Sequence, residues 1–258
     1  MSAISASFAR MDLGIANRRA LVTGGSQGLG LGTAVALAEE GVKVVIASRS
    51  QEKLDKAMAD HPSIFGSVVA DLSTPADVEN LVGSAQSQLG GIDMVVLNAG
   101  GPKAGGYRSA SIQDIEAALN QNLLSMIALA QRTVEPMVQS GWGRILAITS
   151  LWVRQPAPNL ILSNTARSAL TAYLKTLATE VAPAGVTVNT IQPGLHKTDR
   201  LIALHGGDPS AAAATLPSKS FGDPNDFGKV AAFLMSEHAK YVNGASLWVD
   251  GGLYSGLI

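Results

Sequence analysis

Residues 19–30 read RALVTGGSQGLG, and this stretch decides the fold. The apolar run ALVT is typical of a short buried strand. Glycines follow at Gly24, Gly28 and Gly30, and a helical pattern then covers 29–40. Glycines permit a tight turn and let backbone N–H groups approach a phosphate at the start of a helix. The stretch therefore predicts a strand, a phosphate-binding turn and a helix.

The same turn also contains the pattern Gly-x-Ser-x-Gly, with Ser26 at its centre. That pattern marks the nucleophile of α/β-hydrolases, which also lies between a strand and a helix. In hydrolases, however, several strands come before this turn, whereas here it follows the first. Of the four histidines, only His196 and His205 fall in a loop suited to a catalytic partner. We therefore favour the dinucleotide interpretation over the hydrolase one.

Short apolar runs and helical patterns alternate along the rest of the chain. Strands are predicted at 20–23, 43–47, 66–70, 93–97, 143–148, 186–191 and 246–249, and helices at 29–40, 51–59, 75–89, 111–135, 164–182 and 225–237. This alternation predicts an α/β fold, a single-domain Rossmann-like sheet of about seven parallel strands with helices on both faces. We expect the strand order 3-2-1-4-5-6 plus one more strand.

Composition excludes several classes of protein. Hydrophobic residues make up 47% of the 258, and 19 Lys and Arg are balanced by 20 Asp and Glu. Without a basic surplus, nucleic acid is not an expected partner. The chain has no cysteine, and no two histidines stand at metal-ligand spacing, so neither a disulfide scaffold nor a catalytic metal is expected. No apolar run is long enough for a membrane span, and a cytoplasmic protein is the default expectation.

The residues after the second predicted strand bear on the choice of cofactor. A site that prefers NAD places an acid here to hold the ribose 2′-hydroxyl, but this chain has Arg49 and no acid before Glu52. Because an arginine can pair with a 2′-phosphate, we expect NADP, with NAD as the alternative. The other interpretation of Arg49 is a solvated surface residue.

From Asp12 onward the chain resembles the short-chain dehydrogenase/reductase family, in its classical branch, which includes the 3-oxoacyl-acyl-carrier-protein reductases. The resemblance rests on motifs in the family's order: TGGSQGLG at 23–30, Asp71-Leu72, NAG at 98–100, Asn122, Ser150, Pro193-Gly194 with Thr198, and VDGG at 249–252. All of them follow the carboxyl ends of predicted parallel strands, where ligands of open α/β sheets bind.

The resemblance implies a set of cofactor-binding residues. Asp71 and Leu72 would flank the adenine, and Pro193, Gly194 and Thr198 would meet the nicotinamide end. The full cofactor set that we expect is Gly24, Ser26, Gln27, Gly28, Leu29, Gly30, Arg49, Asp71, Leu72, Asn98, Ala99, Gly100, Arg167, Pro193, Gly194 and Thr198. Taken singly, these residues also have ordinary structural explanations, such as Asp71 as a helix cap.

One departure from the family concerns its chemistry. The family uses a Tyr thirteen residues after the serine matched here by Ser150, and a Lys four residues later. Those positions hold Ser163 and Arg167, and no Tyr in the chain is followed by Lys at that spacing. The resemblance thus implies an atypical subgroup with Ser-x-x-x-Arg, whose catalytic residues would be Asn122, Ser150, Ser163 and Arg167.

The replacement weakens acid–base chemistry more than cofactor binding. An aliphatic hydroxyl holds its proton far more tightly than a phenol, and losing a positioned general acid typically costs about 10²- to 10⁴-fold in rate. Three outcomes stay open. Ser150, Ser163 and a water relay the proton; another residue such as Tyr107, Lys103 or His196 supplies it; or hydride transfer is lost.

Two functions therefore follow as expectations. The first is an NADP-dependent oxidoreductase that interconverts a carbonyl and an alcohol, with Asn122 holding a structural water and Arg167 holding the nicotinamide ribose. The alternative is a catalytically impaired or inactive homologue that binds a dinucleotide or a partner without turnover. The family implies a homo-oligomer, a tetramer or a dimer.

Two segments fall outside the alternating pattern. Residues 1–11 are expected to form a loose arm, and 12–258 a single domain. Residues 195–223 mix glycine, proline and serine after the sixth strand, and a long irregular insertion at this point predicts a lid over the site.

Overall fold

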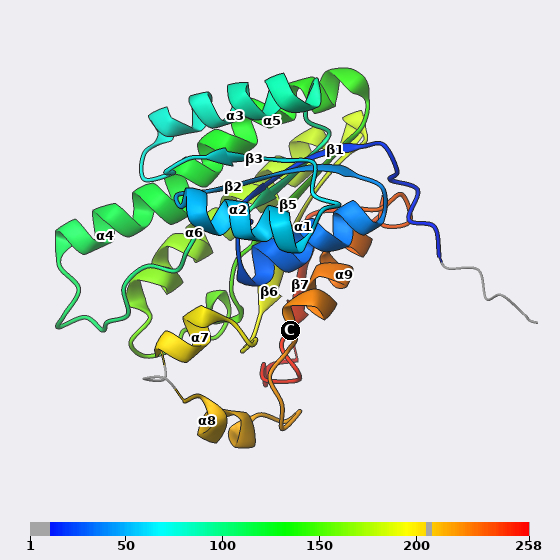
Figure 1. Cartoon of the computed structure of the whole chain (residues 1–258). Helices are drawn as coiled ribbons and strands as arrows, with labels where there is room; N and C mark the ends of the chain where they lie inside the picture. The colour runs from blue at the N-terminus through cyan, green and yellow to red at the C-terminus, as the bar shows by residue number, and fades with distance from the viewer. Residues whose placement is uncertain (1–10, 205–207, 258) are drawn as a thin grey trace, which may run out of the picture.

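The computed structural model describes residues 11–204 and 208–257, so the predicted arm lies outside the described residues except for Met11. In this part of the chain the core is a seven-stranded sheet of order β3-β2-β1-β4-β5-β6-β7 (Figure 1). Its strands are β1 (Arg19–Thr23), β2 (Lys43–Ser48), β3 (Gly66–Val69), β4 (Met94–Leu97), β5 (Gly143–Ile148), β6 (Val186–Pro193) and β7 (Ser246–Val249). Every neighbouring pair is parallel. The predicted fold and strand order are confirmed.

Helices cover both faces of the sheet, as the apolar sequence of its strands requires. One face packs on α1 (Gly28–Glu39), α2 (Gln51–Asp60) and α9 (Pro224–Leu234). The other packs on α3 (Pro75–Leu89), α5 (Ser125–Ser140) and α6 (Ile161–Val181). Neighbouring residues in a strand serve opposite faces, so Val22 of β1 belongs to the first core and Leu21 to the second.

The predicted single helix over 111–135 is wrong in detail. It consists of α4 (Ile112–Leu119), a π-helical turn η1 (Asn120–Leu124) and α5, which continues to Ser140 past Pro136. Extra turns of this kind inside α-helices often occur at functional sites. Here the π-helical turn contains Gln121, which lines the pocket described below, and it leads into the core helix α5.

The segment predicted to form a lid contains two short helices, α7 (Asp199–Leu204) and α8 (Ser210–Thr215). Its two ends meet at an isolated bridge between His196 and Gly222. Residues 205–207 lie outside the described residues. The sequence did not predict either helix, and the role of the segment as a lid stays a prediction.

Helices α1 and α9 approach each other through glycines. A Cβ on Gly32 would collide with the Pro224 carbonyl oxygen, and one on Gly228 would collide with the Gly32 carbonyl oxygen. The two backbones are therefore in direct contact, which only glycine allows at these positions. This close packing holds the C-terminal helix against the helix that follows the glycine-rich turn. No helix in the described ranges is long and apolar enough to cross a membrane.

Candidate functional site

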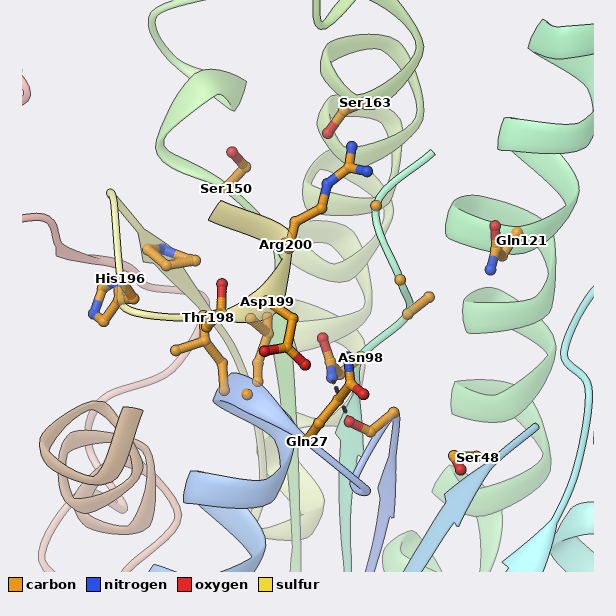
Figure 2. Close-up of a pocket in the computed structure, with 18 of the residues that line it drawn as sticks. Gln27, Ser48, Asn98, Gln121, Ser150, Ser163, His196, Thr198, Asp199 and Arg200 are labelled. Carbon is orange, nitrogen blue, oxygen red and sulfur yellow. Dashed lines mark hydrogen bonds between the residues drawn. The ribbon is translucent and has the colours of Figure 1, made fainter. Parts of the chain in front are cut away.

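A cavity of about 520 Å³ opens at the carboxyl ends of the strands, where ligands of open α/β sheets bind (Figure 2). It is bordered by the glycine-rich turn, the ends of β2 to β6, the start of α6 and helix α7. Residues separated by about 180 positions in the sequence thus share one pocket, because parallel strands deliver their carboxyl ends to the same edge.

The glycine-rich turn has the conformation that its sequence predicts. Gly24 and Gly28 have φ of 57° and 59°, which glycine adopts without strain. Thr23 Oγ1 donates to the Asn98 carbonyl oxygen at 2.8 Å, and Asn98 Nδ2 donates to the Gly24 carbonyl oxygen at 3.2 Å. These bonds fix the turn to the end of β4. The N-cap residue of α1, Gln27, does not cap the helix with its side chain, so the N–H groups of the first turn are left for a ligand.

Most of the predicted cofactor residues line this cavity: Gly24, Ser26, Gln27, Gly28, Leu29, Arg49, Asp71, Leu72, Asn98, Ala99, Gly100, Arg167, Pro193, Gly194 and Thr198. Gly30 does not. A Cβ at Gly30 would collide with the Gly24 carbonyl oxygen and approach Asn98 Nδ2 at 2.6 Å. Gly30 thus serves the close packing beneath the turn, and its predicted contact with a cofactor stays a prediction.

A second positively charged side chain, four residues after Arg49, also lines the cavity. Lys53, in the first turn of α2, lines the cavity, and its Nζ donates to Gln27 Oε1 at 2.6 Å. The helix begins at its N-cap Ser50, whose Oγ accepts from the Lys53 N–H at 3.3 Å. This bond sets the direction in which Lys53 leaves the helix. Arg49 itself is exposed at the cavity wall. Lys53 was not predicted from the sequence, although its spacing of four from Arg49 was a usable signal.

At the other end of the cavity, β5 and α6 bring three predicted residues together. Ser150, Ser163 and Arg167 all line it, and Figure 2 shows both serines at the same end of the pocket. Ser150 Oγ accepts from the Trp152 N–H at 3.2 Å, so its own hydroxyl hydrogen is left to donate. Ser163 and Arg167 lie one turn apart on α6 and therefore on one face of the helix.

Arg167 holds the ends of two strands together. Its Nη1 donates to the carbonyl oxygens of Ile148 at 2.7 Å and Thr149 at 2.8 Å, and Nη2 donates to Ala99 at 3.0 Å. Three of its five N–H groups are therefore used by backbone. Burial, with a smaller contribution from the charge of Arg200, lowers the pKa of Arg167 to about 10, which leaves it protonated at neutral pH.

Asn122 lies in the π-helical turn and is buried, but it is not part of the cavity wall. Among the described residues, neither Oδ1 nor Nδ2 of Asn122 has a hydrogen-bond partner. A buried amide of this kind normally binds an ordered water. Its neighbour Gln121, which was not predicted from the sequence, lines the cavity instead.

Of the three alternative proton donors, Tyr107, Lys103 and His196, only the last lines the cavity. Tyr107 is 74% exposed and its hydroxyl accepts from Arg108, while Lys103 pairs with Asp114 at 3.4 Å. Neither lines the cavity. His196 does line it, but the ring is buried edge-on against Phe227, and burial lowers its pKa. The structure thus keeps only His196 in the pocket, in its neutral form at neutral pH.

Arg200 also lies at this end of the cavity and was not predicted from the sequence. It follows Thr198 by two positions and reaches across the cavity from α7 (Figure 2). Its Nη2 donates to the Pro102 carbonyl oxygen at 2.6 Å. The only signal in the sequence was its position two residues after Thr198, a predicted cofactor residue. Burial lowers the pKa of Arg200 as well.

A parallel sheet of this order, with a glycine-rich turn at its carboxyl edge, defines the Rossmann-like class of α/β proteins. Within that class the chain belongs to the short-chain dehydrogenase/reductase family. The family model described as enoyl-(acyl carrier protein) reductase matches residues 24–254. The resemblance noted in the sequence is confirmed at this level.

Individual relatives cover almost the whole chain. "Dehydrogenase/reductase SDR family member 4" of Homo sapiens is 32% identical over 250 residues, which are 94% of this chain and 90% of the relative. The 3-oxoacyl-[acyl-carrier-protein] reductase of Vibrio cholerae is 31% identical over 91% of this chain and 96% of its own. The crystal structure of L-sorbose reductase from Gluconobacter frateurii, complexed with NADPH and L-sorbose, superposes with a TM-score of 0.88 at 31% identity, covering 96% and 100% of the two chains.

Proposed function

We propose that this chain is an NADP-dependent oxidoreductase that interconverts a carbonyl compound and an alcohol, with Ser163 and Arg167 at the family's Tyr and Lys positions. The observation that carries the proposal is the continuity of the cavity. One pocket joins a phosphate-binding turn, a pair of cations, and two serine hydroxyls. Family membership supports the reaction class, and the sorbose reductase of the same fold was solved with NADPH.

The residues fit a dinucleotide with a 2′-phosphate. The N–H groups at the start of α1 would hold the pyrophosphate. Arg49 and Lys53 would hold the 2′-phosphate, and the wall between Ala47 and Lys53 contributes no acid to the cavity. Arg167 retains two N–H groups beyond its three backbone bonds, enough to donate to ribose hydroxyls.

This assignment is tested by nucleotide titration of the double variant Arg49→Gln/Lys53→Gln. Each charge-assisted contact to phosphate is worth about 1.5–3 kcal/mol, so we expect the Kd for NADPH to rise at least ~10-fold. The Kd for NADH should change little, because NADH lacks the 2′-phosphate. Lys56→Gln is the matched control, since Lys56 is on the same helix and pairs with Asp60 at 2.9 Å. Equal losses for both nucleotides would contradict the NADP assignment.

In the proposed reduction, the cofactor and the protein have separate roles. A bound NADPH supplies the hydride, and the protein must orient the carbonyl and provide a proton. Ser150 and Ser163 would donate hydrogen bonds to the substrate oxygen from the end of the cavity that they share. Neither hydroxyl ionises near neutral pH, so the proton must come from water through the two serines. We therefore expect turnover to be slow, about 10²- to 10⁴-fold below that of an enzyme with a positioned general acid.

The second candidate function is dinucleotide binding without turnover. The observation that favours it is that no tyrosine in the described part of the chain lines the cavity. A panel of carbonyl compounds assayed with NADPH separates the two candidates. Measurable reduction that falls further in Ser163→Ala supports the reductase. Tight NADPH binding without turnover, not rescued by Ser163→Tyr/Arg167→Lys, supports the binding protein.

The homo-oligomer that the family resemblance implies and the cytoplasmic location expected from the sequence composition stay predictions. Analytical ultracentrifugation of the purified protein tests the first, with a tetramer or a dimer expected. Fractionation of the source cells tests the second.

A further inference from the structure

Arg200 is fixed in place within the cavity. Besides the bond from Nη2 to the Pro102 carbonyl oxygen, its guanidinium group rests against the backbone of Gly101. A Cβ on Gly101 would lie only 3.1 Å from Arg200 Nε and 3.2 Å from Cζ. The absence of a side chain at Gly101 thus lets the guanidinium group lie flat across the loop after β4, on the side of the cavity where Figure 2 shows Ser163.

The charge of Arg200 has no counter-ion in the described part of the chain. None of the ion pairs formed there includes it, and its neighbour Asp199 points toward Gln27 in Figure 2. Instead a second guanidinium group, that of Arg167, lines the same end of the cavity. Burial lowers the pKa of both groups. Partly desolvated cations of like sign are costly unless an anion joins them.

The cofactor does not supply that anion. Its phosphates would bind at the start of α1, which lies next to Thr198, and at Arg49 and Lys53, whereas Figure 2 shows the Arg200 guanidinium group extending the other way, toward Ser163. The nicotinamide end carries no negative charge. The negative group must therefore belong to the molecule that reaches Ser150 and Ser163.

We propose that Arg200 binds a carboxylate of the substrate, so that the substrate class is an oxo acid or the corresponding hydroxy acid. The proposal rests on the proposed function for the position of the reacting carbonyl beside the two serines. Arg200 uses one of its five N–H groups on Pro102 and keeps an edge for two parallel hydrogen bonds to a carboxylate. Trp152, Leu160 and Leu204 line the same cavity and suit a short carbon chain.

The test compares acids with their own neutral esters. Protein saturated with NADP⁺, which cannot reduce a ketone, is titrated with 2-oxobutanoate, 4-oxopentanoate and the methyl ester of each. Binding is followed by calorimetry, so the readout does not depend on turnover. The wild type should bind at least one acid ~10- to 100-fold more tightly than its ester. Arg200→Gln should abolish that preference and leave ester binding within about 3-fold, and Arg200→Lys should retain part of it.

Arg108→Gln is the matched control, because Arg108 is exposed, contacts Tyr107 and does not line the cavity. If Arg200→Gln weakens acid and ester equally, Arg200 only holds α7 to the loop at Pro102, and the proposal fails. A wild type that prefers no acid to its ester also overturns it. A phosphate ester of a hydroxyketone that binds as tightly as the acids, with the same dependence on Arg200, would overturn the carboxylate class. Arg200-dependent acid binding without turnover by the NADPH-loaded protein would count against the reductase; the carboxylate site would then stand without the substrate class.

Discussion

Gly30 is the residue whose absent side chain matters most to the turn. A methyl group there would collide with the Gly24 carbonyl oxygen. We predict that Gly30→Ala destabilises the protein by about 1–3 kcal/mol, the usual cost of overpacking, and also weakens NADPH binding. Gly83→Ala is the control, because a Cβ there meets nothing within 4 Å in the middle of α3. That change should stabilise by about 0.5–1 kcal/mol. Urea denaturation measures both, and a neutral Gly30→Ala would contradict the packing argument.

His196 links the stability of the site to pH. Burial lowers its pKa in the folded protein below the ordinary value of 6.5. Between that lowered pKa and 6.5, the unfolded chain binds more protons than the folded one, so stability rises with pH across this window. The contribution is complete above pH 6.5 and is lost as the pH falls.

We predict that His196→Gln reduces the pH dependence of the unfolding free energy between pH 7.5 and 5.5. Denaturation curves at both values measure it. The exposed His238, changed to Gln, is the control. An unchanged slope in His196→Gln would contradict the assignment of this pH dependence to His196.

At the scale of elements, strands were easier to predict from the sequence than helices. Continuous apolar runs such as VKVVIA leave little choice of conformation, and the predicted strand ends differ from the observed ones by two residues at most. The π-helical turn at Asn120–Leu124 has no counterpart in the sequence pattern, because it changes only the hydrogen-bond register. Helices α7 and α8 were missed because each is too short to show a period.

Glycines of the turn and residues at family motif positions, such as Arg167, could be predicted to line the candidate site, whereas long side chains that reach it from outside those motifs could not. Glycines such as Gly24 could be predicted because the tight turn requires a backbone conformation that glycine adopts without strain. Lys53 and Arg200, by contrast, enter the cavity through long flexible side chains. Their direction is set by the start of α2 and by contact with Gly101, which no local pattern encodes.

Pro136 explains why the predicted helix ended too early. Proline lacks an N–H and usually ends a helix, yet α5 runs on to Ser140 with the exposed Pro136 inside it. We predict that Pro136→Ala stabilises the protein by about 1–3 kcal/mol, because it restores a helical hydrogen bond and relieves the ring contact with the preceding turn. Thermal unfolding measures the change. A lower midpoint would contradict this account of Pro136.

The stability of the whole molecule depends on the contact between α1 and α9, because this contact closes the first hydrophobic core. A side chain at Gly228 would push α9 away from the Gly32 carbonyl oxygen and open the first core, in which Phe227 and Ala231 are fully buried. We predict that Gly228→Ala costs at least about 3 kcal/mol of unfolding free energy, at the upper end for overpacking, since backbone rather than a flexible side chain must move. Lys229→Ala, at an exposed neighbouring position, should change stability by less than about 0.5 kcal/mol. Similar losses in the two variants would contradict the backbone contact.

The central place of β1 has a consequence during protein synthesis. β1 pairs with β2 on one side but with β4 on the other, through partners such as Leu21 and Val95. The ribosome adds roughly 5–20 residues per second. One edge of the first strand therefore waits roughly 4–15 s for its neighbour, with unpaired N–H and C=O groups. During those seconds the nascent chain exposes an apolar strand edge, and we expect chaperone binding to be strongest in this interval.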